Sequence, residues 1–290
     1  MIVSRWPEKL LKWVQVATHV HSSVTDTYSC SGTQSLSEIA YFALTAGLKG
    51  VVLNNHTSDA SNPIAPMPHE LMSTLSLKFR EADRLHEELL EQGSDLYFLA
   101  GIEANVMLNG SLDVTRTETE HISTYTIASQ HGGLGTQEVD ARAIYRRLET
   151  VGANPTVHAV GHPFRNIDHV QAVDWPRILA HLSKTNTAAE VNLNSFKKSQ
   201  GSLDFWYKWL KAAENQGTPL VIGFDIHNEG MWPTLRPQEY WHTTLMDFQQ
   251  LLDVMIWAGL KPGQVLNSDA ERFQNWILTP KSDRGNAIDW

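Results

Sequence analysis

Residues 35–56 read SLSEIAYFALTAGLKGVVLNNH, and this stretch contains the clearest helix-then-strand pattern of the chain. Ser35 and Glu38 have the spacing of a helix-capping box, and apolar residues then recur at helical spacing until Gly47, a typical helix stop. A short run of buried character, VVLNN, follows and leads directly into His56. The stretch therefore predicts an amphipathic helix followed by a buried strand that ends at a histidine.

The same alternation of strand and helix continues along the chain. Alternating order of this kind predicts parallel strands with helices outside them, either as a barrel or as a doubly wound sheet. We expect seven strands, at Trp13–Val20, Gly50–Asn55, Leu96–Val106, Ser123–Gln130, Thr156–Gly161, Ala188–Asn194 and Leu220–Asp225. Further helical patterns cover Met72–Gln92, Gln137–Glu149, Trp175–Leu182, Leu203–Gln216 and Trp241–Ala258.

One connection departs from this alternation. Residues 107–122 are polar and rich in turn formers, so we expect a loop or hairpin between the third and fourth strands. No repeat, low-complexity segment or linker divides the 290 residues. The chain is therefore expected to form one domain over residues 1–290, with its motifs in 13–228 and a helical closure in 229–290.

Composition excludes several classes of protein. The net charge of −9 disfavours a general nucleic-acid binder, which needs a basic face. A single cysteine, Cys30, excludes an intramolecular disulfide framework. No apolar run reaches the roughly 18 residues of a membrane span, and charges near the N-terminus argue against a secretory leader. We therefore expect a cytoplasmic protein without a membrane partner.

The chain contains 13 histidines, a high number beside its 23 lysines and arginines. In a parallel barrel the carboxyl ends of all strands meet at one mouth, where active sites form. Six histidines and three carboxylates fall at or just beyond predicted strand ends: His19, His21, Asp26, His56, Glu103, His131, His162, Asp225 and His227. The sixth strand adds Glu190, Asn192 and Asn194 as further candidates.

This donor set favours divalent metal ions. Residues two apart on a strand point the same way, so both members of a His-x-His or Asp-x-His pair can reach one ion. Each residue also has an ordinary structural interpretation; Asp225, for example, fits a helix N-cap. Nitrogen and oxygen donors suit Zn, Mn or Fe. One ion needs only three or four protein ligands, so nine candidates indicate two or three ions.

The order of these motifs resembles the polymerase and histidinol phosphatase family. The residues concerned are THVHSSVTD (18–26), NNH (54–56), GIE (101–103), SQH (129–131), GHP (161–163) and FDIH (224–227). The resemblance spans residues 17–228 in the family's order. It implies a single distorted (β/α)7 TIM-like barrel, with up to three metal ions at the carboxyl ends of the strands. It also implies hydrolysis of phosphate esters.

The resemblance implies a role for each candidate ligand. His19, His21, Glu103 and Asp225 would hold the first ion, and Glu103 would bridge to a second held by His131 and His162. Asp26, His56 and His227 would hold a third, and Glu103, Asp225 and His227 would be catalytic. The chain departs from the family at two positions: Asn55 replaces the usual Asp, and Thr27 replaces a frequent Gly.

A small phosphomonoester is the expected substrate. We hypothesise that a hydroxide bridging the metal ions attacks phosphorus, since bound divalent ions lower the pKa of water and neutralise phosphoryl charge. Arg165, Lys197 and Lys198 follow strand ends and are candidates for binding the phosphate. An ordinary solvated loop would explain the same three residues.

Three other functions compete with this hypothesis. Relatives include exonucleases and phosphodiesterases that act on nucleic acid or nucleotides, although the acidic charge disfavours them here. Amidohydrolase-type C–N hydrolases also begin with His-x-His on the first strand, but they commonly carry a modified lysine on the fourth, where this chain has His131. A non-catalytic metal-binding module is the third alternative, and degenerate relatives of that kind typically lose ligands.

Overall fold

The computed structural model describes residues 5–23, 34–58, 69–131, 141–163, 173–198, 202–226 and 237–285. Within them, seven strands pair in chain order and close into a barrel, with every neighbouring pair parallel. The strands are β1 (Val16–Val20), β2 (Gly50–His56), β3 (Tyr97–Asn105), β4 (Tyr125–Ser129), β5 (Ala159–Gly161), β6 (Ala188–Asn192) and β7 (Leu220–Ile226). The predicted seven-stranded α/β barrel is confirmed.

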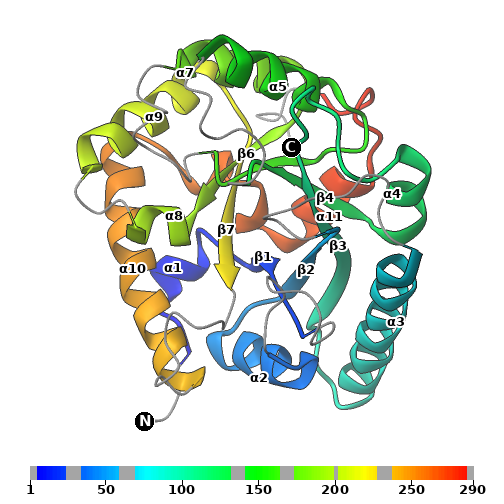
Figure 1. Ribbon diagram of the computed structural model, residues 1–290. Helices are drawn as coiled ribbons and strands as arrows, with labels where there is room; N and C mark the ends of the chain where they lie inside the picture. Colours follow the sequence, from blue (N-terminus) through cyan, green and yellow to red (C-terminus); the bar gives the residue numbers. More distant parts are fainter. Residues whose placement is uncertain are drawn as a thin grey trace.

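Helices surround the strands in chain order (Figure 1). Those between strands are α2 (Leu36–Ala46), α3 (His69–Glu91), α4 (Arg116–Ile122), α5 (Ala141–Ala153), α7 (Trp175–Lys184), α8 (Leu193–Lys198) and α9 (Leu203–Gln216). Those at the two ends of the chain are α1 (Glu8–Leu11), α10 (Pro237–Trp257), the short 3-10 helices η2 (Pro262–Gln264) and η3 (Leu266–Ser268), and α11 (Ala270–Leu278).

The opening stretch folds as its sequence predicts. Ser35 accepts a hydrogen bond from the backbone N–H of Glu38, and the Glu38 carboxylate accepts one in return from the Ser35 N–H at 2.8 Å. At the other end of α2, Gly47 has a φ of 87°, a left-handed conformation that glycine adopts without steric cost. The chain then enters β2, which ends at His56.

Residues 107–122 contain more structure than the predicted loop or hairpin. Val106 and Leu112 do form an antiparallel bridge, as a hairpin would. A helix, α4, then follows, and it begins with a second capping box formed by Thr115 and Glu118. The Thr-x-x-Glu spacing was therefore a usable signal for this helix, although the surrounding polar residues obscured it.

Two apolar clusters fix the layers of the fold. The larger lies between the strands and the surrounding helices, and the smaller fills the amino-terminal end of the barrel. Inward residues such as Val52 and Tyr125 form this smaller cluster together with Phe273 and Trp276 of α11. Since α11 closes that end, the polar inward residues farther along the strands lie at the opposite, carboxyl-terminal mouth.

A bulge in β1 decides where its histidines point. Val16 belongs to the cluster inside the barrel, whereas Ala17 and Val20 pack outside it. Regular alternation from Val16 would place Val20 inside as well, but the pairing register shifts between Ala17 and Val20 against β2 and between Thr18 and Val20 against β7. This irregularity turns His19 and His21 toward the barrel axis, because an extra residue reverses the alternation beyond it.

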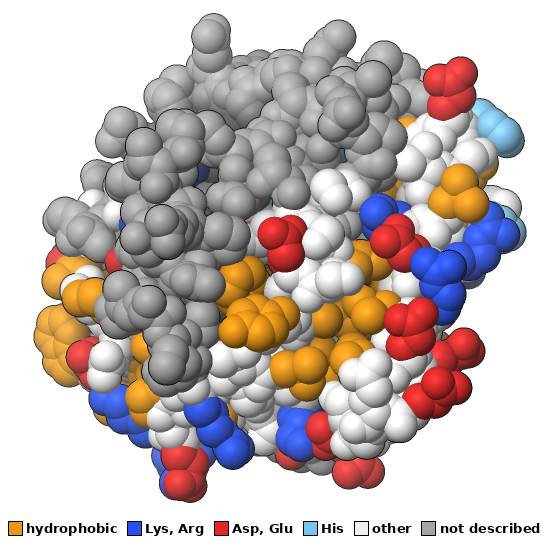
Figure 2. Space-filling view, turned by 90° about the horizontal axis from the view of Figure 1, so that it is seen from below, with side chains coloured by type: hydrophobic (Ala, Val, Ile, Leu, Met, Phe, Trp, Pro, Cys, Tyr) orange, Lys and Arg blue, Asp and Glu red, His pale blue; other side chains and the backbone are white. Residues whose placement is uncertain are grey.

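The charged surface is mixed on the face drawn in Figure 2. There, lysine and arginine side chains of the described residues are interspersed with acidic and apolar ones. Within the described ranges, we find no helix with the length and apolar character needed to span a bilayer.

Candidate metal centre

Glu103, an inward residue of β3, lies at the centre of the site and is completely buried. Each of its carboxylate oxygens faces a different set of histidines. The nitrogen–oxygen distances are 2.7 Å to His162, 3.2 Å to His19 and 3.2 Å to His131 at Oε1, and 3.1 Å to His56 and 3.5 Å to His21 at Oε2. Five histidines from four strand ends thus converge on one carboxylate.

The five imidazoles form a closed ring around this carboxylate. Each ring lies beside the next in chain order, and the last returns to the first. The centroid separations are 5.2 Å for His19–His21, 4.7 Å for His21–His56, 5.2 Å for His56–His131, 5.1 Å for His131–His162 and 5.6 Å for His162–His19. Parallel closure of the barrel produces this order, because successive strands bring successive histidines to the mouth.

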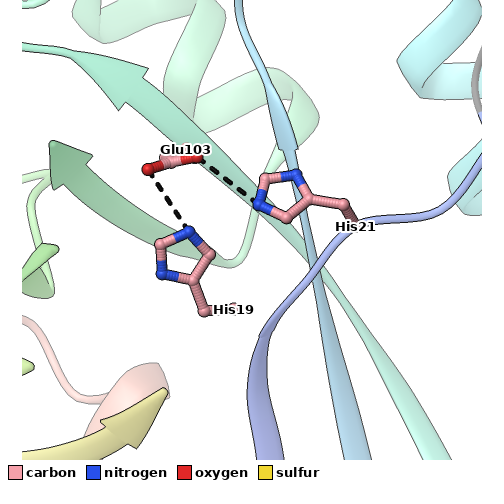
Figure 3. A group of neighbouring side chains, drawn as sticks. All are labelled: His19, His21 and Glu103. Carbon is pink, nitrogen blue, oxygen red and sulfur yellow. Dashed lines mark ion pairs between the residues drawn. The ribbon is translucent and has the colours of Figure 1, made fainter. Parts of the chain in front are cut away.

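Two groups of three residues have the spacing of metal ligands. In each group the donor atoms lie within 4.8 Å of one another. One group contains His19 and His21, whose imidazoles approach different oxygens of Glu103 (Figure 3). The other contains His56 and His131, again with Glu103. A carboxylate shared in this way can bridge two divalent ions.

The structure brings together seven of the nine predicted ligands. Asp225 joins the five histidines and Glu103, with its Oδ1 3.7 Å from Nε2 of His19 and 3.9 Å from Nε2 of His21. Its other oxygen accepts a hydrogen bond from Asn194 at 3.2 Å. Asp26 and His227 lie outside the described residues, so the third ion that they would share with His56 stays a prediction.

The predicted phosphate-binding residues are less fully placed. Arg165 lies outside the described part of the chain. Strand β6 ends at Asn192, two residues earlier than predicted, and α8 follows at once, so Lys197 and Lys198 lie on a helix. Lys197 forms an ion pair with Asp247 at 3.3 Å, and Lys198 is exposed.

Backbone strain is concentrated at the site. Among the described non-glycine residues, four have a positive φ, and three of these are His19 at 59°, His162 at 22° and Asp225 at 52°. Such conformations cost about 1–3 kcal/mol each and persist where the surroundings over-determine them. Asn54 accepts a hydrogen bond from the His19 N–H at 2.9 Å, and Glu190 accepts one from the His162 N–H.

Glu190 also determines which nitrogen of His19 carries a proton. Its Oε1 lies 2.6 Å from Nδ1 of His19, and an ionised carboxylate can only accept. A neutral His19 therefore has its proton on Nδ1 and a lone pair on Nε2. That Nε2 lies 3.2 Å from Oε1 of Glu103, and among the described residues it has no hydrogen-bond partner.

A divalent cation fits this arrangement. The lone pairs of His19 Nε2 and Glu103 Oε1 face each other at 3.2 Å and repel unless positive charge lies nearby. The three buried carboxylates of Glu103, Glu190 and Asp225 also need positive charge close to them. Imidazole nitrogen with carboxylate oxygen is the donor set of Zn, Mn and Fe sites. A zinc-bound histidine usually donates its other ring N–H to an acceptor such as a carboxylate, as His19 does to Glu190.

A proton can supply positive charge at His19 when a cation does not. Burial alone would lower the pKa of His19, but the carboxylates of Glu190, Glu103 and Asp225 outweigh it and raise this pKa well above 6.5. Burial alone would raise the pKa of Glu103, but His19, His56 and His131 hold it well below 4.5. Because metal ions compete with such protons for the same nitrogen, their affinity should rise with pH.

Asn55, the departure from the family pattern, ties two strand ends together. Its Oδ1 accepts a hydrogen bond from the Ser22 N–H at 2.8 Å, and its Nδ2 donates to the Ser22 hydroxyl at 3.1 Å. The contact fixes the chain directly after His21. An amide serves here as both acceptor and donor, which an ionised Asp could not do. Thr27, the other departure, lies outside the described residues.

Sequence reasoning missed two buried residues next to the site. Asn105 follows Glu103 by two positions on β3, so strand periodicity could have revealed it. Its Oδ1 accepts a hydrogen bond from Nδ1 of His131. Asp113 lies on the connection after β3 and accepts hydrogen bonds from Asn105, Thr57 and Ser58. No local pattern indicates this residue, because its partners come from distant parts of the chain.

Comparison with solved structures identifies the fold. The chain is similar to histidinol phosphate phosphatase from Lactococcus lactis subsp. lactis, crystallised with zinc, L-histidinol and phosphate. The match covers 85% of this chain and 94% of that one, with a TM-score of 0.57 and 16% identity. The chain has the fold of a histidinol phosphate phosphatase. Histidinol phosphatase is one of the two activities that name the family whose motifs the chain resembles.

Two other solved structures are more distant. A structure of archaeal ribonuclease P with mature tRNA matches with a TM-score of 0.43 and 11% identity, over 84% of this chain and 90% of that chain. An uncharacterized protein matches with a TM-score of 0.41 and 11% identity, over 91% and 74%. No protein-family model matches the sequence. No curated protein matches it either.

Proposed function

We propose that the chain is a metal-dependent phosphoesterase of the polymerase and histidinol phosphatase family, and that its substrate is a small phosphomonoester. The observation that carries this proposal is the position of Glu103, whose carboxylate belongs to both three-ligand groups, one with His19 and His21 and the other with His56 and His131. Two divalent ions joined in this way form the clamp that many phosphatases use on the attacking and leaving oxygens. The fold, shared with a phosphatase, agrees with the proposal.

The buried residues would act as ligands and as holders of those ligands. His19, His21 and Asp225 would bind one ion with Glu103, and His56, His131 and His162 would bind on its other side. Asp26 and His227 would hold a third ion together with His56, as the motif resemblance implies. When bound, divalent ions supply an activated water and neutralise the charge of the phosphoryl group.

Neighbouring side chains would keep the ligands in binding form. Glu190 holds the proton on Nδ1 of His19, so Nε2 presents its lone pair to the centre. Asn194 donates to Oδ2 of Asp225, so the other oxygen stays directed toward His19 and His21. Such supports orient the ligand atoms toward the ions that they would bind.

Charge favours a small phosphorylated substrate over a long polyanion. The chain carries a formal charge of −9, whereas two or three divalent ions would make the mouth locally positive. We propose Arg165, Lys197 and Lys198 as phosphate-binding residues near this mouth. Of the two lysines, which both lie on α8, Lys198 is the exposed one.

The test combines metal analysis with phosphate release. Purified protein should contain divalent ions, and chelation should abolish release of phosphate from phosphomonoesters until Zn, Mn or Fe is restored. Glu103→Gln and Asp225→Asn should each lower kcat/KM by more than about 100-fold, the upper range of effects seen when mere supports of a metal ligand are lost.

A matched control uses a carboxylate far from the centre. Asp95 is exposed and pairs with Lys49, so Asp95→Asn should retain activity. Unchanged hydrolysis in Glu103→Gln would overturn the proposal. Release of mononucleotides from oligonucleotides without phosphomonoesterase activity would instead establish the nuclease alternative.

A further inference from the structure

The side chain of Asp113 is completely buried and lies outside the ring of candidate ligands. Its carboxylate is the acceptor in each of its four hydrogen bonds with the described residues. The donors are the Thr57 hydroxyl at 2.7 Å, the Ser58 hydroxyl, the Asn105 backbone N–H at 2.9 Å and the Asn105 side-chain Nδ2 at 2.6 Å. The proposed ligand set does not include this residue, so its burial needs another explanation.

The first consequence concerns the orientation of Asn105. An ionised carboxylate accepts hydrogen bonds and donates none, so the Nδ2 of Asn105 must face Asp113. The same Nδ2 lies 3.0 Å from the Ser58 hydroxyl. The amide oxygen of Asn105 is therefore turned to the other side, where it meets Nδ1 of His131.

The second consequence concerns the tautomer of His131. Because the Asn105 oxygen accepts, Nδ1 of His131 carries the proton. The lone pair of a neutral His131 then lies on Nε2, which is 3.2 Å from Oε1 of Glu103. A reversed amide at Asn105 would place a donor against Nδ1 and move the proton to Nε2, where it would block metal binding.

The third consequence concerns the end of β2. Thr57 and Ser58 follow His56 directly, and both hydroxyls donate to Asp113. One carboxylate thus fixes the chain after His56 and, through Asn105, the imidazole of His131. These two histidines are the partners of Glu103 in one of the two three-ligand groups.

We propose that Asp113 is a positioning residue for the metal ion at His56, Glu103 and His131, and that it acts by fixing the Nδ1-protonated tautomer of His131 through Asn105. The proposal rests on the proposed function for the metal itself. It concerns one of the two ligand groups, because the group of His19 and His21 is held by Glu190 instead.

The deciding variant is Asp113→Asn. Its amide lets Asn105 reverse, so His131 should shift its proton to Nε2. In 15N-histidine NMR spectra of metal-free protein, at a pH where His131 is neutral, the protonated nitrogen should change from Nδ1 to Nε2. In equilibrium dialysis, one metal ion should bind about 10–100-fold more weakly, and the other should keep its affinity.

A second variant restores the pattern with the roles exchanged. In Asn105→Asp/Asp113→Asn, the new carboxylate accepts from His131 and the new amide donates to it, so Nδ1 protonation and most of the metal affinity should return. Thr187→Val is the matched control: it removes a buried hydroxyl that donates to the Gly152 carbonyl at 2.9 Å, far from the mouth. It should lower stability without changing the tautomer.

The outcomes separate this inference from the proposed function. If His131 keeps its proton on Nδ1 in folded Asp113→Asn, or if the double variant folds with the proton on Nε2, the inference is overturned. Equal weakening of both metal ions would also overturn it, since that result indicates a general structural role. If wild-type protein binds no metal ion, the proposed function fails, and the tautomer measurement still decides whether Asp113 controls His131.

Discussion

Glu190→Gln should weaken metal binding without removing any proposed ligand. Glu190 accepts from Nδ1 of His19 at 2.6 Å, from the His162 N–H and from Nδ2 of Asn192 at 3.1 Å. Glutamine has almost the same volume but replaces one acceptor oxygen with a donor. Whichever way its amide is turned, the new NH2 group faces at least one existing donor.

The least costly response is a change of tautomer at His19. If the amide NH2 faces Nδ1, the imidazole proton moves to Nε2 and removes the lone pair that faces Glu103. Loss of such a support typically weakens metal affinity about 10–100-fold. This corresponds to about 1.4–2.8 kcal/mol at 1.4 kcal/mol per tenfold. A buried polar group left unpaired costs about 1–3 kcal/mol, which agrees with that range.

Competition with a chromophoric chelator measures the affinity, and thermal unfolding at saturating metal measures the linked stability. Asn267→Ala is the matched control. Asn267 is buried and bonds Val16 and Ile222 at the opposite end of the same two strands, β1 and β7. The control should unfold more easily and keep wild-type metal affinity. Wild-type affinity in folded Glu190→Gln would refute the role given to Glu190.

Two further predictions follow from the same buried charges. Because folding raises the pKa of His19, protonated His19 stabilises the metal-free fold fully below pH 6.5, and this stabilisation is lost as the pH rises from 6.5 through the raised pKa. Because folding lowers the pKa of Glu103, the stabilisation from ionised Glu103 is lost only as the pH falls below 4.5. Chemical denaturation should therefore show chelated protein losing stability above pH 6.5 and metal-loaded protein keeping it; identical pH profiles would contradict this. Gly223→Ala would place a Cβ 1.7 Å from Oε1 of Glu190 and should lower both the Tm and the metal affinity. Gly50→Ala, whose Cβ would lie 2.3 Å from the Tyr97 ring, should lower the Tm alone, and an equal loss of affinity in both variants would show that the effect is not local.

The barrel could be predicted from sequence because its signals are local. Each strand is a short apolar run, and each helix between strands has its own periodicity and, in several cases, its own cap, as at Ser35 and Thr115. Strand ends were placed less accurately: β6 stops at Asn192 because α8 begins there, although the sequence predicts a strand through Asn194. Helix and strand compete at such junctions, and local propensity does not decide between them.

Convergence of the candidate ligands was predictable for a similar reason. Residues at the carboxyl ends of parallel strands must meet at one mouth, so the positions of His56, Glu103 and His162 in the sequence already indicated a shared site. The bulge in β1 was not predictable in this way, because it arises from pairing with two other strands. Without it, the alternation set by Val16 would direct His19 away from the axis.

The order of the strands and of most of the helices, the identity of the donors and the end of the barrel at which they gather could all be read from the sequence. Which nitrogen of His19 and of His131 is available to a metal ion became evident only from the folded structure. That choice depends on Glu190 for His19 and on Asp113, through Asn105, for His131. Neither carboxylate is a sequence neighbour of the histidine that it affects, and a proton's position on an imidazole follows from its neighbours in space rather than in sequence.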